Sequence, residues 1–331
     1  MTVKLDVRAL TVELPTRVGW VRPVNEVDFL LGEGETLGIV GESGSGKTML
    51  ALALMGLEPP GAHRHGEAWL YPRTRHDSDG NRWNLIAAAD PEMRALRGRE
   101  ISMIFQEPMT AFNPVIRVGV QIEEAIRIHE PHLDGSEIGR RALEAIDRAA
   151  IPEPALRARQ YPHQLSGGLR QRALIAMALA AAPGMLIADE PTTALDVTVQ
   201  KQILDLLQTL SHDLKLSLLF ITHDLGVVDQ IADRIAVMYA GRIVEQGPAR
   251  EVLSHPCHPY TEGLLRARPR LQRQKLEPIP GVVPALEALP PGCAFAPRCS
   301  LRVRGCDARV PDLARASGAA EGHRARCILV P

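Results

Sequence analysis

The order of hydrophobic and polar positions along the chain predicts a mixed α/β protein. Residues 2–14 alternate between apolar and polar side chains, as expected of an edge strand. A second strand pattern, at residues 24–31, ends before a glycine-rich turn at 32–35. Short runs of apolar character, each typical of a buried strand, then recur at residues 36–40, 101–105, 185–190 and 218–221.

Helical spacing of apolar residues fills the segments between these runs. Residues 49–57 and 199–211 each show this pattern, and residues 115–182 are expected to be mostly helical. Residues 235–239 and 242–245 predict a closing hairpin. The alternation of strand and helix favours a parallel sheet covered by helices.

The polar stretch from Tyr71 to Asn84 is expected to form a hairpin loop. It contains His76, Asp77 and Asp79, so a metal site is the alternative interpretation. A solvated loop is favoured, because polar side chains gather in such loops without binding an ion.

A phosphate-binding loop follows the run at residues 36–40. The segment Gly41-Glu42-Ser43-Gly44-Ser45-Gly46-Lys47-Thr48 matches G-x-x-x-x-G-K-[ST] in full, between a predicted strand and a predicted helix. Its glycines let backbone N–H groups approach the phosphates of a nucleotide. Lys47 is expected to reach the β- and γ-phosphates, and Thr48 to bind Mg²⁺.

Two further motifs fit a bound nucleotide. Ser166, Gly167 and Gly168 open a predicted helix, whose N-terminus attracts anions. Asp189 and Glu190 end a predicted strand, where neighbouring side chains point to opposite sides, so one can face a metal ion and the other a water molecule. Either motif alone also fits an ordinary turn or a solvated loop; their order downstream of the phosphate loop favours the nucleotide site.

Composition narrows the classes of function. The 38 basic and 39 acidic residues give a formal net charge of −1, which argues against a nucleic-acid-binding surface. With 45% hydrophobic but only 4% aromatic residues, the core is expected to be aliphatic. The N-terminus lacks a signal-peptide pattern, and no apolar run approaches the roughly 20 residues that span a bilayer. We therefore expect a cytosolic protein that reaches a membrane only through partners.

The chain resembles ATP-binding cassette (ABC) transporter ATPases, and more narrowly the ATPase subunits of dipeptide, oligopeptide and nickel importers. The narrow resemblance covers nearly the whole chain. One departure is Leu169, where the subfamily usually has Met, a side chain of similar volume. The resemblance is carried by residues 105–114 (FQEPMTAFNP), 161–168 (YPHQLSGG), 220–225 (FITHDL) and 258–261 (HPYT).

The resemblance implies a P-loop NTPase ABC cassette with a RecA-like core sheet, an antiparallel β subdomain and a helical subdomain. On this basis we expect an ATPase domain at residues 1–250, with its helical subdomain at about 107–182. A small C-terminal extension of the oligopeptide-importer type is expected at residues 251–331.

The resemblance also implies roles for residues outside these motifs. Gln106 is expected to touch Mg²⁺ and the attacking water, and His223 matches the switch histidine. Asp196 ends a loop that lies against the phosphate loop of a partner cassette in the family. Trp20 is the only aromatic residue near the segment whose aromatic side chain stacks on adenine in the family; a surface or core tryptophan is the equally weighted alternative.

These roles predict ATP hydrolysis coupled to import. Lys47, Thr48 and the loop amides are expected to hold MgATP, Asp189 to support Mg²⁺, and Glu190 to act as general base or orient water. Ser166, with the two glycines after it, would close over the ATP held by a second ATPase subunit, a paralogue or a second copy.

The implied partners are that second subunit, two transmembrane permease subunits and, indirectly, an extracytoplasmic solute-binding protein. They place the chain at the cytoplasmic face of the inner membrane. Peptide uptake is favoured over uptake of nickel only by resemblance. A non-transport ABC ATPase acting on nucleic acid or ribosomes is the alternative from another class, and neither a basic arm nor a long coiled-coil insertion supports it.

A proline-rich tail from about residue 248 holds all five cysteines. Four of them, Cys293, Cys299, Cys306 and Cys327, have the spacing C-x5-C-x6-C-x20-C. A cytosolic chain is not expected to hold structural disulfides, so the clustering predicts a metal site. The resemblance implies a [4Fe–4S] cluster; zinc and free thiols remain the alternatives, because thiolate ligands alone do not select the metal. Cys257 is expected to be a bystander.

Overall fold

The protein is described by a computed structural model that covers the chain except for a few short segments. Residues 107–110, which belong to a motif quoted above, lie outside the described residues, as do Ala194 of the loop that ends at Asp196 and His76, Asp77 and Asp79 of the polar loop. The described ranges are 2–72, 82–106, 111–193, 195–267, 278–316 and 318–330.

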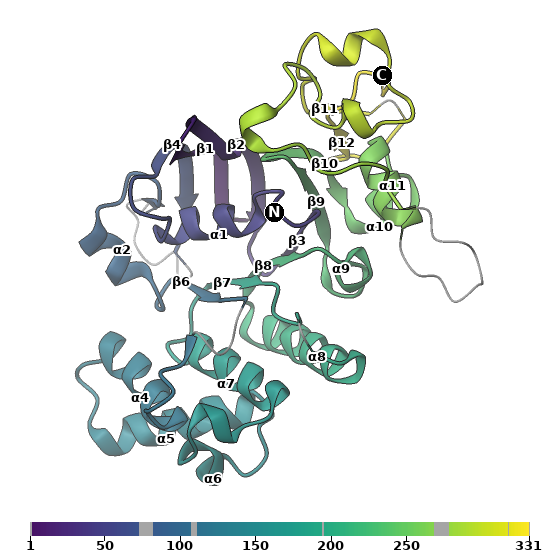
Figure 1. Ribbon diagram of the computed structural model, residues 1–331. Helices are drawn as coiled ribbons and strands as arrows, with labels where there is room; N and C mark the ends of the chain where they lie inside the picture. The colour runs from purple at the N-terminus through teal and green to yellow at the C-terminus, as the bar shows by residue number, and fades with distance from the viewer. Residues whose placement is uncertain are drawn as a thin grey trace.

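An eight-stranded sheet forms the centre of the molecule (Figure 1). Strands β9, β3, β8, β7 and β6 are parallel neighbours in that order, and β10 pairs antiparallel with β9 as the predicted closing hairpin. These strands are apolar runs buried on both faces, which is how parallel strands become stable. Their bounds are β3 (Thr36–Val40), β6 (Ile101–Ile104), β7 (Met185–Asp189), β8 (Ser217–Thr222), β9 (Arg234–Tyr239) and β10 (Arg242–Pro248).

A separate four-stranded antiparallel sheet has the order β2-β1-β4-β5. The expectation that the first strand lies at an edge is wrong, because β1 pairs with β2 on one side and β4 on the other. Alternation of apolar and polar side chains indicates that one face of a strand is buried, but it does not indicate where the strand lies within the sheet. The bounds are β1 (Val3–Thr16), β2 (Gly19–Gly32), β4 (His63–Leu70) and β5 (Trp83–Asn84).

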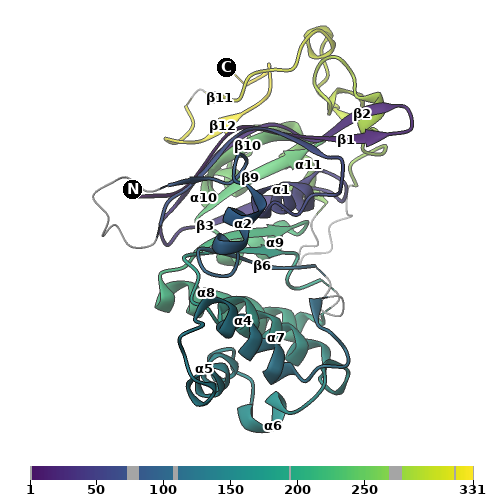
Figure 2. The same ribbon diagram turned by 90° about the vertical axis from the view of Figure 1, so that its left-hand side faces the viewer.

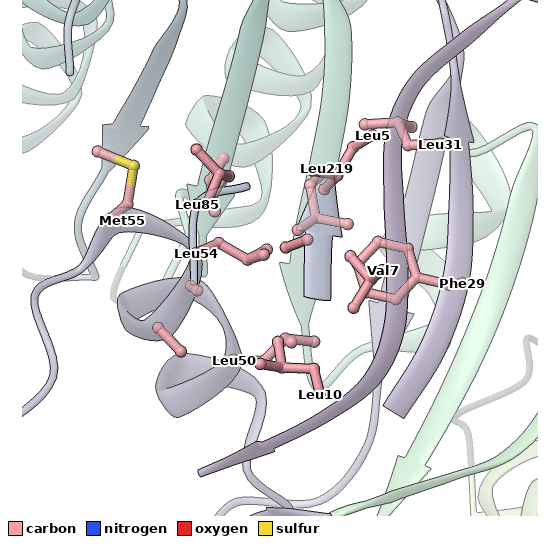
Figure 3. Packing of buried hydrophobic residues seen from close by; sticks show 14 of the residues in the cluster. Leu5, Val7, Leu10, Phe29, Leu31, Leu50, Leu54, Met55, Leu85 and Leu219 are labelled. Atoms are coloured by element: carbon pink, nitrogen blue, oxygen red, sulfur yellow. The ribbon is translucent and has the colours of Figure 1, made fainter. Parts of the chain in front are cut away.

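Helix α1 (Lys47–Met55) lies between the two sheets (Figure 3). Leu50 and Leu54 of the helix belong to the same buried cluster as Leu5 of β1 and Leu219 of β8. Fully burying each leucine contributes about 1.5–3 kcal/mol. This packing fixes the N-terminus of α1, and with it the loop that precedes the helix. The short helix α2 (Asp90–Leu96) also packs on this cluster through Met93.

The opposite face of the eight-stranded sheet is covered by α8 (Val197–Leu214) and α9 (Leu225–Ile231). Along β7, Leu186 and Ala188 face this second cluster, while Ile187 faces α1. Successive side chains of a strand point to opposite faces, so one apolar run builds both cores. No helix among the described residues is long and apolar enough to cross a membrane.

A group of helices beyond β6 and β7 forms a third buried cluster of its own (Figures 1 and 2). Ile122, Ile146 and Leu174, from three different helices, are buried in this cluster. Residues 115–182 are thus mostly helical, as predicted. The bounds are α4 (Val118–His129), α5 (Gly135–Arg148), α6 (Pro154–Ala158) and α7 (Gly167–Leu179).

The C-terminal residues after β10 are joined to the central sheet by a strand and by hydrogen bonds to a buried glutamate. Strand β12 pairs with β10 and thereby adds β11 to the central sheet. The fully buried Glu245 of β10 accepts hydrogen bonds from the backbone N–H groups of Cys257 and His258, at 2.7 and 2.9 Å, and bonds to His323 Nε2 at 2.7 Å. The bounds are α10 (Ala249–Ser254), α11 (Pro259–Arg266), β11 (Ala314–Arg315) and β12 (Arg324–Ala325).

Candidate functional site

The loop between β3 and α1 has the backbone that the phosphate-loop motif requires. Gly44 and Gly46 have φ angles of 79° and 104°, in the region that favours glycine. A Cβ atom on Gly41 would lie 2.1 Å from the carbonyl oxygen of Met238, and one on Gly46 would lie 1.9 Å from that of Pro23. The glycines are therefore needed for the fold of the loop as well as for a ligand's approach. Because the left-handed Gly46 is the N-cap, α1 begins at Lys47.

Lys47 lies within the curve of this loop and is 5% exposed. Its Nζ donates hydrogen bonds to the carbonyl oxygens of Gly41 and Glu42, at 2.8 and 3.0 Å. Burial lowers the pKa of Lys47, while the nearby carboxylates of Glu190 and Asp189 act to raise it. A cation held among loop carbonyls in this way is suited to bind an anionic phosphate.

Asp189 ends β7 and is 1% exposed. Its Oδ1 atom has no hydrogen-bond partner among the described residues, and the Thr48 hydroxyl nearby acts to lower the pKa of the carboxyl group. Burial raises the pKa of Asp189 to about 6, more than the Thr48 hydrogen bond lowers it. A buried carboxylate oxygen without a partner, beside a hydroxyl, is a ligand set that fits Mg²⁺.

Glu190, the first residue after β7, lies close to three polar side chains. Its Oε2 atom accepts hydrogen bonds from Thr193 Oγ1 at 2.8 Å and Gln106 Nε2 at 3.3 Å, and lies 3.2 Å from His223 Nδ1. Glu190 has φ = 47°, an uncommon value that aims the side chain at this cluster.

Burial would raise the pKa of Glu190, but the hydrogen bonds from Thr193 and His223 outweigh it and lower the pKa. The carboxylate is therefore ionised at neutral pH and can accept a proton or hold a water molecule. Thr193 was not singled out from the sequence. Its position three residues after Glu190, in a turn, was the available signal.

The predicted helix at Ser166 is also present. Ser166 is the N-cap of α7, and its Oγ accepts a hydrogen bond from Leu169 N at 3.3 Å. A Cβ atom on Gly168 would lie 2.8 Å from Val199 Cγ1, so this glycine allows α7 to approach the start of α8. Asp196 caps α8 there by accepting from the N–H groups of Thr198 and Val199 at 3.0 and 2.9 Å. Gly167 lies beside Leu195.

Trp20 lies in β2 and is 52% exposed. Its ring stacks on His63 of β4, with ring centres 4.5 Å apart. Arg22 and Pro23, which follow it closely in β2, have carbonyl oxygens next to Gly241, and Pro23 also borders Gly46. Stacking of Trp20 on adenine stays a prediction.

The four clustered cysteines line one pocket, which Phe295 and His258 also border. Burial raises the pKa of Cys293, Cys299 and Cys327. Cys257 is not part of this lining. It lies within metal-ligand range of Glu245 and His323, the one such group of three among the described residues.

Sequence reasoning assigned no role to two residues of the extension that contact the phosphate loop. Arg298 forms an ion pair with Glu42, and the Tyr260 hydroxyl accepts a hydrogen bond from Glu42 N. The available signals were the HPYT motif that includes Tyr260 and the position of Arg298 beside Cys299.

Comparisons with known proteins agree with this geometry. The family model described as ABC transporter matches residues 24–193, and the one described as oligopeptide/dipeptide transporter, C-terminal region, matches residues 244–306. The chain is 49% identical over 332 residues to a protein of Brucella abortus named "putative peptide import ATP-binding protein", covering 98% of this chain and 96% of the relative. A Brucella suis protein of the same description is 46% identical over 318 residues, covering 96% and 93%.

Among solved structures, an ATP-binding cassette captured as a dimer in a post-hydrolysis state with ADP and phosphate is 27% identical. Its TM-score is 0.64, and the match covers 74% of this chain and 99% of that one. A Clostridium perfringens protein, described as part of an ABC transporter complex, has a TM-score of 0.63 at 25% identity, covering 77% of this chain and 92% of that one. The chain therefore belongs to the ABC transporter ATPases, as an ATP-hydrolysing cassette of P-loop fold that carries the C-terminal region of oligopeptide and dipeptide transporters.

Proposed function

We propose that this chain drives the uptake of di- or oligopeptides across the cytoplasmic membrane. The observation that carries this proposal is the joint match to the cassette and to the oligopeptide/dipeptide transporter C-terminal region, in relatives named for peptide import. The chain would act at the cytoplasmic face of the membrane, held there by two permease subunits. An extracytoplasmic solute-binding protein would deliver the peptide to those subunits.

The geometry around β7 supports specific roles in hydrolysis. Lys47 and the loop amides would bind the β- and γ-phosphates, with Thr48 and Asp189 as ligands of Mg²⁺. The metal ion would neutralise charge that develops on the phosphates. Glu190, ionised, hydrogen-bonded by Thr193 and Gln106 and beside His223, would orient the attacking water and accept its proton. Gln106 and His223 would contact the water or the γ-phosphate from the same cluster.

A second cassette would complete the site. Ser166 and Gly168 lie at the start of α7 against α8, in the helical part of the chain, whereas Lys47 lies between the two sheets. We propose that two cassettes meet head to tail, so that the α7 N-terminus of each closes over the nucleotide bound by the other. Asp196 would lie at the same interface.

Peptide import can be tested with the assembled transporter. We expect this chain to co-purify with the permease pair of its transport system, and the complex to hydrolyse ATP faster when a solute-binding protein loaded with peptide is added. The same binding protein without peptide is the control. Stimulation by nickel in place of peptide would reject peptide as the substrate, and co-purification with nucleic acid would reject transport.

We also propose that the cysteine pocket holds a [4Fe–4S] cluster. A zinc ion bound by thiolates at about 2.3 Å requires sulfur atoms about 3.8 Å apart. Among the described residues, no three of the cysteine sulfurs lie within 4.8 Å of one another, although all four cysteines line one pocket. What supports a cluster is that all four cysteines line one pocket, since four thiolates are the ligand set that such a cluster takes. Such a cluster would link the segments around Cys293, Cys306 and Cys327 without a large hydrophobic core.

Replacing Cys306 by serine is expected to remove the metal. Protein purified without oxygen should contain iron and sulfide in equal amounts and show a broad visible absorbance; the Cys306→Ser variant should lose both. Cys257→Ser is the matched control and should retain them, because Cys257 is not among the residues that line the pocket. Zinc without iron in the wild-type protein would reject the cluster.

A further inference from the structure

The C-terminal extension contacts the phosphate loop through one charged residue. The Arg298 guanidinium forms a bidentate ion pair with Glu42, the second residue of the loop, with N–O distances of 2.6 and 3.0 Å. The two residues are 256 positions apart in the chain. Bidentate pairs of this kind fix the orientation of both partners, because two parallel hydrogen bonds must form together.

Arg298 is also held in place by residues outside the phosphate loop. Its side chain is 4% exposed, its Nε donates to the carbonyl oxygen of Pro280 at 2.9 Å, and its Nη1 lies 3.4 Å from the Tyr239 hydroxyl. The guanidinium also lies 6.0 Å from the ring centre of Phe295. The hydrogen bond to Glu42 raises the pKa of Arg298 further. These contacts therefore orient a buried cation toward the Glu42 carboxylate.

Tyr260 contacts the backbone of the same loop residue, Glu42. The tyrosine is fully buried, and its hydroxyl accepts a hydrogen bond from Glu42 N–H at 2.9 Å. Its ring packs against Tyr239 and Phe295, with ring centres 4.6 and 5.3 Å away. The Glu42 carbonyl in turn accepts from Lys47 Nζ at 3.0 Å. The peptide groups on both sides of Glu42 are thus fixed, one by the extension and one by the phosphate-binding lysine.

We propose that Arg298 and Tyr260 are positioning residues for the phosphate loop. They hold it in its nucleotide-binding form before ATP arrives, so that less ordering is needed on binding. Arg298 also neutralises Glu42, whose carboxylate would otherwise repel a triphosphate in the same loop. The inference rests on ATP hydrolysis by this chain, but it requires neither peptide as the transported solute nor an iron–sulfur cluster.

The test is steady-state ATP hydrolysis by the full-length protein in its transporter complex. We expect Arg298→Gln to raise the KM for ATP about tenfold or more, with kcat within about threefold of wild type, since one charge-assisted bidentate pair is lost. Arg298→Lys should recover part of the affinity through its charge. Replacing Glu42 by glutamine in the Arg298→Gln background should also recover part, because the unpaired carboxylate is then gone.

Arg302→Gln is the matched control. Arg302 lies four residues away in the same extension and pairs with Asp307 at 2.9 Å, but both side chains are about half exposed and lie outside this contact. Its KM should equal that of wild type. If Arg298→Gln is too unstable to purify, Tyr260→Phe removes only the hydroxyl and should still raise KM by a fewfold.

A purely structural role for Arg298 would lower the amount of active enzyme, and so kcat, while leaving the KM of the folded fraction unchanged. That result, or a wild-type KM in Tyr260→Phe, would overturn the inference. Either result would leave the transport function intact, whereas absence of hydrolysis by the wild-type complex would count against the proposed function itself.

Discussion

Glu190→Gln is expected to reduce ATP turnover by about 10²–10⁴-fold while leaving ATP binding close to wild type. The carboxylate is an ionised acceptor held by Thr193, Gln106 and His223, and an amide cannot take up the proton of the attacking water. The side chain keeps its size and one oxygen acceptor, so we expect ATP affinity to be retained. Release of phosphate under saturating MgATP gives the turnover, and fluorescent nucleotide titration gives the affinity.

The same variant should also accumulate as an ATP-bound dimer of cassettes. Hydrolysis is expected to open the interface between two cassettes, so blocking it traps the closed form. Size-exclusion chromatography with and without MgATP would detect the change. Glu251→Gln, at a partly exposed ion pair with His255 on α10, is a control that should behave as wild type. Turnover at the wild-type rate in Glu190→Gln would remove Glu190 from the proposed role.

Lys47→Ala is expected to weaken ATP binding about 100-fold and to abolish measurable turnover at ordinary nucleotide concentrations. The Nζ group is buried in the loop, and each hydrogen bond from a charged donor contributes about 1.5–3 kcal/mol. Removing it also leaves the carbonyl oxygens of Gly41 and Glu42 without this donor. Isothermal titration with a non-hydrolysed ATP analogue measures the loss directly.

A destabilised loop alone could also reduce ATP affinity. The thermal unfolding of Lys47→Ala and of wild type, both without nucleotide, should therefore be compared. We expect the melting temperature of Lys47→Ala to remain within a few degrees of wild type, because α1 stays packed through Leu50 and Leu54. Lys201→Ala, at an exposed position on α8, is the matched control. Unchanged ATP affinity in Lys47→Ala would contradict the reading of this loop as the phosphate site.

The two variants separate binding from chemistry. Lys47 is expected to act on the ground-state complex and therefore on affinity, whereas Glu190 acts on the water and therefore on kcat. Their positions explain the difference. Lys47 contacts the phosphate loop from the start of α1, whereas Glu190, the residue after β7, contacts Gln106 and Thr193.

Local sequence was a good guide wherever a motif is contiguous. The left-handed glycines, the strand before them and the helix after them follow from the loop motif itself, because backbone conformation there depends on neighbouring residues. The strand-end alternation expected of Asp189 and Glu190 does not apply, because β7 ends at Asp189 and Glu190 has a left-handed backbone with φ = 47°. The edge position expected for residues 2–14 failed because strand order depends on pairing partners far along the chain.

The sequence by itself determined the phosphate loop, the helix that Ser166 caps, the paired carboxylates and the clustering of four cysteines in the tail. Each of these is a short-range pattern whose chemistry is fixed by spacing. Only the tertiary structure decided contacts that no motif announced: the ion pair of Arg298 with Glu42, 256 residues apart, and the hydrogen bond from Glu42 N to the Tyr260 hydroxyl. Such contacts depend on how the strands are ordered and how the extension packs on the sheet. These are properties of the whole fold, and no segment of the chain encodes them alone.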